Sequence, residues 1–238
     1  MKHCNGSQDR TSRLIVPIAC ATALPMALTI SLAHSAHADA IGVPPVPGNI
    51  QVLAPNTPYL VGHATGTQNY VCLPSGAGFK FTLFTPEATL FNENGKQIIT
   101  HYFSPNPEES GQPVRATWQS LDTSTVWGSV GPNDSSSDSA FVKPGAIAWL
   151  KVTVVGNHEG PSGGDKLTET TFIQRLNTHG GLAPPTGCAS LSDVGREAFM
   201  PYTADYFFYK DKEKRGPGAV DARSDAGVRG GRPAERYL

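Results

Sequence analysis

The chain has 238 residues, and its 19 Lys and Arg residues nearly balance its 20 Asp and Glu residues, for a net charge of −1. Residues 39–209 carry eight basic and fourteen acidic side chains, a net charge of −6, whereas residues 210–238 carry eight and five, a net charge of +3. An acidic body without a basic stripe argues against nucleic-acid binding. The size suits one domain with its own core.

Residues 1–38 have the pattern of a secretory signal peptide. Basic residues precede an apolar stretch from Leu14 to Leu32, and Ala36-His37-Ala38 is typical of a cleavage site. Cleavage is expected after Ala38, with a second register after Ala40. An uncleaved membrane anchor is the alternative, which the prolines in the stretch disfavour. The pattern therefore predicts a secreted protein that has no membrane span after cleavage.

Residues 39–58 are rich in Pro, Ala, Val and Asn, and we expect an extended lead-in there. Short apolar or alternating runs then recur, separated by Gly, Pro, Asn and Ser, as in chains made of strands and turns. No window has sustained helical periodicity, although residues 192–200 have room for one helical turn. The expected strands cover residues 59–63, 67–73, 79–83, 88–91, 96–103, 114–121, 125–130, 146–155, 167–173 and 202–209.

From Lys210 onward the chain has charge, Gly and Pro but few apolar residues, so residues 210–238 are expected to be a disordered tail. The structured domain is therefore expected to span residues 59–209. About nine to ten short strands with turn signals between them predict a single-domain, all-β fold, either a β-sandwich or a β-barrel.

Removal of the leader leaves two cysteines, Cys72 and Cys188. In an oxidising compartment an even pair far apart in sequence predicts one disulfide. Two free thiols or a metal site are the alternatives. A metal site would need further ligands, and neither cysteine has a Cys-x-x-Cys partner or a close histidine. The other histidines also lack metal-binding spacing, so no metal and no cofactor are expected.

Polar and aromatic side chains at several strand-like positions are candidate site residues. Arg175 follows an apolar run, so it needs an acid or carbonyl groups as partners if it is buried. The preferred interpretation is a structural network of Arg175 with Asp205 or Glu87. The other interpretation is a polar patch in a ligand pocket with tryptophan walls. The candidate ligand-binding residues are His101, Trp118, Arg175, Gln174 and Gln68.

Catalytic patterns are weak, and no catalytic residue is assigned. Residues 160–164 match the G-x-S-x-G pattern around Ser162, but they link two expected strands and no helix follows, as a nucleophile elbow requires. A carbohydrate-acting hydrolase with Glu87, Asp122 or Asp205 is the alternative function. Such an enzyme needs two carboxylates across a cleft, and their separation is not readable from sequence.

Several segments together resemble a secreted bacterial and fungal family, the domain of unknown function 3455. The matching segments are residues 66–72, 86–91, 101–102, 116–118, 122–128, 148–150, 174–181 and 201–209. The resemblance covers residues 59–209 and implies a secreted, β-rich domain with a Cys72–Cys188 bridge. The family has no established activity, so it assigns no catalytic residues.

The sequence thus leads to one main functional expectation. We expect a secreted, non-catalytic β-domain that binds an unknown small molecule or a cell-surface glycan. The carbohydrate-acting hydrolase is kept as the alternative.

Overall fold

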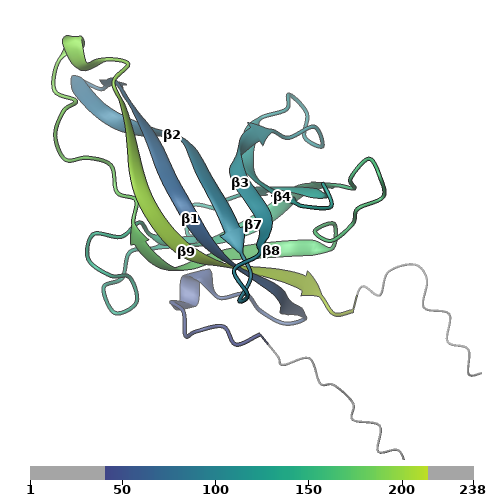
Figure 1. The fold of residues 1–238 in the computed structure, drawn as a ribbon. Helices are drawn as coiled ribbons and strands as arrows, with labels where there is room; N and C mark the ends of the chain where they lie inside the picture. The colour runs from purple at the N-terminus through teal and green to yellow at the C-terminus, as the bar shows by residue number, and fades with distance from the viewer. Residues whose placement is uncertain (1–40, 214–238) are drawn as a thin grey trace, which may run out of the picture. The chain divides into compact units, whose positions relative to one another are not determined.

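The computed structural model describes residues 41–213 (Figure 1). The predicted signal peptide at residues 1–38 lies outside the described residues, as does most of the predicted tail at 210–238. The described part has nine strands, two short 3-10 turns and no α-helix. The strands are β1 (Asn56–Ser75), β2 (Gly78–Phe91), β3 (Gln97–Pro105), β4 (Val114–Ser120), β5 (Thr125–Ser129), β6 (Ser135–Ser136), β7 (Trp149–His158), β8 (Thr170–Gly180) and β9 (Glu197–Asp211); the turns are η1 (Gly48–Ile50) and η2 (Leu191–Asp193).

Eight of the strands form a closed antiparallel barrel. The hydrogen-bonded order is β5-β4-β3-β2-β1-β9-β8-β7, and β5 also pairs with β7, which closes the sheet. The short strand β6 is added beside β7 outside this ring. Closure leaves no free edge within the ring itself and creates an interior that side chains or a ligand can fill. The predicted all-β fold is confirmed, and it is a barrel rather than a sandwich.

Two pairs of expected short strands are each one long strand. Residues 59–63 and 67–73 both belong to β1, which is 20 residues long. Residues 79–83 and 88–91 both belong to β2, which has 14 residues. Gly66 lies between the first two runs, but it serves a close approach rather than a turn: a Cβ there would lie 2.0 Å from the carbonyl oxygen of Glu87.

The strands β1, β2 and β9 continue past their other neighbours as a three-stranded extension (Figure 1). β8 pairs with β9 only as far as Tyr202, and β3 pairs with β2 only from Ala88 onward. A Cys72–Cys188 disulfide joins the extension to the segment before η2, as predicted. Such a bond is typical of an oxidising, extracytoplasmic compartment.

Alternation along the strands creates two separate apolar clusters. On β9, Tyr206 and Phe208 face the barrel interior. Phe207 and Tyr209 face outward and pack with Ile50 of the lead-in. Because both faces of β9 are covered at these four positions, residues 206–209 form an unbroken aromatic run. In residues 41–213 no helix has the length and apolar character needed to cross a membrane.

Candidate ligand-binding cavity

One end of the barrel interior holds a cavity of about 440 Å³, a size that suits a small molecule. Seven of the eight barrel strands supply lining side chains; β5 does not. The cavity has an apolar mouth, where Leu83, Val130 and Leu182 are 40, 41 and 46 % exposed. Its inner wall is buried, since Trp118 and Tyr206 are each 1 % exposed. The cavity thus leads from an apolar rim to a closed aromatic floor.

His101 and Trp118 form the centre of the floor. They are opposite each other in the β3–β4 ladder, and their rings stack with centroids 4.3 Å apart and 9° between planes. The Tyr206 ring lies against both, with its centroid 5.3 Å from that of His101 and 5.8 Å from that of Trp118. Aromatic groups in such offset and edge arrangements fix one another's orientation.

His101 is neutral in the folded protein. Burial is the main cause that lowers its pKa, to about 3, and the nearby positive charge of Arg175 acts in the same direction. The Nδ1 atom lies 2.8 Å from the carbonyl oxygen of Thr117. Because a carbonyl only accepts, Nδ1 carries the proton and donates, which leaves Nε2 as the unprotonated ring nitrogen.

Arg175 brings one positive charge into this aromatic environment. In the ladders it lies between Leu150 on β7 and Tyr206 on β9, and both of these residues line the cavity. Its Nη2 donates a hydrogen bond of 2.9 Å to the carbonyl oxygen of Ala148. Burial raises the pKa of Tyr206, and the charge of Arg175 only partly offsets this, so the phenol stays neutral. No acidic side chain lines the cavity in the described part of the chain.

Three buried donors in the cavity lining have no hydrogen-bond partner among residues 41–213. They are Nε2 of Gln68, which lies near the Tyr202 phenol without a well-formed bond to it, Nε1 of Trp118 and Nε of Arg175. Native proteins leave few buried donors unpaired, and such groups often mark a place for water, an ion or a ligand. All three are N–H groups that neighbouring atoms cover at the cavity floor, so the floor contains donors that lack an acceptor.

Residues 53–210 match the family described as Protein of unknown function (DUF3455). The chain belongs to this family. No curated protein and no solved structure is significantly similar to it. The matched range covers all nine strands apart from the last residue of β9, so the DUF3455 domain comprises the barrel and its cavity.

Four of the five candidate ligand-binding residues of this DUF3455 domain meet in the cavity: Gln68, His101, Trp118 and Arg175. Gln174 does not join them, because consecutive residues of a strand point to opposite faces. It lies on the outer face, where its Nε2 donates to the carbonyl oxygen of Ile50 at 2.6 Å and its Oε1 accepts from Tyr209. Gln174 therefore fastens the lead-in to the barrel.

The expected network of Arg175 with Asp205 or Glu87 is not formed. Asp205 is opposite Leu176 in the β8–β9 ladder and faces outward, whereas Arg175 faces the interior. The sheet therefore separates the two side chains. Glu87 is exposed on β2. The sequence shows an acid and a base on two nearby segments, but the ladder register decides that they lie on opposite faces.

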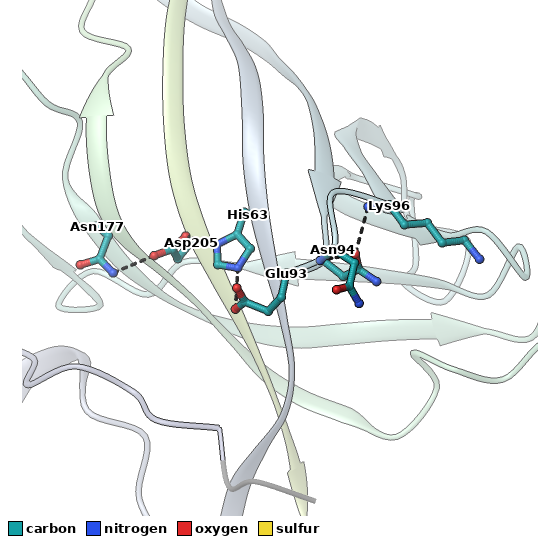
Figure 2. A network of polar contacts seen from close by, with 7 residues as sticks. His63, Glu93, Asn94, Lys96, Asn177 and Asp205 are labelled. Carbon is teal, nitrogen blue, oxygen red and sulfur yellow. Dashed lines mark hydrogen bonds and ion pairs between the residues drawn. The ribbon is translucent and has the colours of Figure 1, made fainter.

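Asp205 instead belongs to a polar network on the outer surface of the barrel (Figure 2). Its Oδ1 lies 2.7 Å from Nδ1 of His63, and its Oδ2 accepts a 2.8 Å hydrogen bond from Asn177. The second ring nitrogen of His63 lies 2.9 Å from Glu93 in the β2–β3 turn. Partial burial alone would lower the pKa of His63, but the hydrogen bonds to Asp205 and Glu93 outweigh it and raise the pKa.

The carboxylates considered for hydrolysis lie away from the cavity. Asp122 caps the β4–β5 turn and accepts hydrogen bonds from the Ser124 hydroxyl at 2.6 Å and the Lys166 amide at 3.0 Å. Burial would raise the pKa of Asp122, but these hydrogen bonds lower it to about 2.

Residues 160–164 form a hydrogen-bonded turn between β7 and β8, closed from Gly160 to Gly164 at 2.7 Å. Within residues 41–213 no cluster of three or more His, Cys, Asp or Glu residues is suited to a metal.

Part of the cavity wall consists of residues that the sequence did not indicate. Tyr70 and Tyr206 line it, as do Leu150 and Val152 of β7. The alternation on β9 was a usable signal, because Tyr206 and Phe208 lie on the same face of the strand. In a barrel, both side chains are therefore expected to point into the interior. Nothing local indicated that Ala116 and Ala148 would leave open space, because that depends on which side chains face them across the barrel.

Proposed function

We propose that this DUF3455 domain is a secreted, non-catalytic binding domain that holds one small, largely apolar molecule inside its barrel. The cavity with an apolar rim and a buried floor of unpaired donors carries this proposal. Pockets of this composition, mainly apolar with a few placed polar groups, are typical small-molecule sites. The signal-like leader and the disulfide support secretion.

Two features favour this function over the alternatives. A glycan has many hydroxyl groups, and few of them would find hydrogen-bond partners at the rim formed by the exposed Leu83, Val130 and Leu182. A glycosidase needs a pair of carboxylates beside the substrate. No carboxylate lines the cavity in residues 41–213, so the residues present favour binding over hydrolysis.

Filling the cavity should strongly weaken the binding of an apolar probe. Ala116 lines the cavity on β4, and Ala116→Phe places a ring in the open space. We expect at least a ~10-fold loss of affinity for the neutral dye N-phenyl-1-naphthylamine, measured by its fluorescence gain, because the ring takes up the room that the dye needs. Ala148→Phe, at a second lining position, should give the same result.

Val114→Phe is the matched control, because Val114 is on the same strand, 60 % exposed and outside the lining. It should leave dye affinity unchanged. Thermal unfolding of each variant shows that the barrel is intact. Dye binding that survives in folded Ala116→Phe and Ala148→Phe would place the dye elsewhere and refute the proposed site.

A further inference from the structure

The chemistry of the cavity floor indicates which kind of molecule fits. Arg175 is the one permanently charged side chain in the lining formed by residues 41–213. Its positive charge acts on His101 and Tyr206, and it lines the cavity together with these two residues and Trp118. A guanidinium that faces an apolar space without a counter-charge is unfavourable, because water is partly removed and nothing replaces its charge stabilisation.

The protein groups around Arg175 do not neutralise it. Its guanidinium donates to the Ala148 carbonyl and also interacts with the Tyr206 phenol, and both of these groups are uncharged. The phenols of Tyr70 and Tyr206 keep their protons, because burial raises the pKa of each despite the nearby positive charge. The acids of the outer network are on the far side of the sheet. The counter-charge is therefore missing from the described residues.

The unpaired donors give a second, independent indication. Gln68 and Trp118 are 2 % and 1 % exposed, and each has a buried N–H group without a partner beside the cavity. A carboxylate is an acceptor with two oxygens and about four lone-pair positions. It would pair with the guanidinium in a fork and accept from neighbouring N–H groups, which is the strongest class of hydrogen bond in proteins.

We propose that the molecule bound in the barrel is an aromatic or aliphatic carboxylate whose carboxylate group binds Arg175, with its apolar part directed toward the rim of Leu83, Val130 and Leu182. This inference rests on the proposed function and adds the charge and orientation of the ligand. Trp118 and Gln68 supply further donors to the carboxylate. The stacked rings of His101 and Trp118 contact the first carbons next to it.

Matched acid and amide probes test this, because the two differ in charge but hardly in shape. The probes are 2-naphthoate with 2-naphthamide, and decanoate with decanamide, titrated by calorimetry at pH 7. For the native protein we expect the acid of at least one pair to bind ~10- to 100-fold more tightly than its amide, as charge-assisted hydrogen bonds allow. Arg175→Gln should abolish that preference and leave amide affinity within about twofold.

Arg115→Gln is the control, because Arg115 pairs with Glu109 at 2.8 Å on the surface, away from the cavity. It should keep the full preference for the acid. If Arg175→Gln does not fold, Arg175→Lys is measured in its place. Lysine keeps the positive charge but cannot form the forked pair of hydrogen bonds, so the ratio of acid affinity to amide affinity should fall but stay above one. Equal binding of acid and amide by the native protein would refute the carboxylate and leave the cavity as a site for neutral molecules. Absence of binding by all four probes would refute both proposals.

Discussion

Acidification from pH 6.5 to 4.5 should lower the free energy of unfolding by about 2 kcal/mol, through His101 alone. Burial against Trp118 and Tyr206 lowers the pKa of this histidine to about 3, well below its usual value of about 6.5. The unfolded chain therefore binds a proton in this range that the folded protein does not. The stabilisation is complete above pH 6.5 and is lost progressively as the pH falls toward 3.

This pH window separates His101 from the other shifted groups. The pKa values of Glu109 and Asp122 are each lowered to about 2, so their contributions are lost mainly below pH ~4.5. The pKa of His63 is raised, so its contribution is fully present below pH ~6.5 and is lost only as the pH rises through the folded value.

The variant His101→Phe keeps a flat ring on Trp118 but cannot be protonated. Urea unfolding at pH 6.5, 5.5 and 4.5 should then show a change of less than about 1 kcal/mol over the window. His158→Phe, at the exposed end of β7, should keep the steep dependence of the native protein. An equally steep dependence in His101→Phe would mean that another group carries the effect and that His101 is not buried as described.

Gly66→Ala should destabilise the fold by about 3 kcal/mol or more. A Cβ at this position would lie 2.0 Å from the carbonyl oxygen of Glu87 and 2.5 Å from Cα of Ala88. Both are backbone atoms of the paired strand β2, so relief requires β1 and β2 to separate. The next pairs along this ladder include Gln68 with Pro86, and both residues line the cavity.

Gly78→Ala is the matched control for this substitution. Gly78 begins β2 in the same hairpin, and a Cβ there meets nothing within 4 Å. Its stability should stay within about 0.5 kcal/mol of the native value. Guanidinium unfolding of both variants gives the comparison, and a Gly66→Ala protein of native stability would contradict the close β1–β2 approach.

The strand pattern was predictable because it depends on local alternation. The runs around Phe81 and Tyr206 are recognisable from alternating residue types or from the turn residues that bound them. The expected strands correspond to parts of the eight barrel strands. Strand length was not predictable in the same way. Taken alone, Gly66 indicates a break between two strands, but a glycine within a strand can also allow a second backbone to come close. Only the position of the paired strand shows which of these two interpretations holds.

The cavity was partly predictable from residue type. An arginine, a histidine and a tryptophan in strands suggested a pocket, and Arg175, His101 and Trp118 do meet there. The direction of each side chain depends on register, since a shift of one residue reverses every face of a strand. For that reason residue type alone predicts Gln174 in the pocket and Asp205 beside Arg175, whereas both face outward in the structure.

The three tryptophan side chains of the protein allow the most direct test of where a ligand binds. Nε1 of Trp118 is unpaired in the cavity lining, and Nε1 of Trp127 donates to Ser104 at 2.9 Å. Trp149 packs in the outer cluster with the lead-in. A titration of ¹⁵N-labelled protein with 2-naphthoate, followed through the three indole N–H resonances, should shift the Trp118 resonance and leave the Trp127 and Trp149 resonances in place. A shift of the Trp149 resonance with that of Trp118 unmoved would put the molecule outside the barrel and contradict the proposed site.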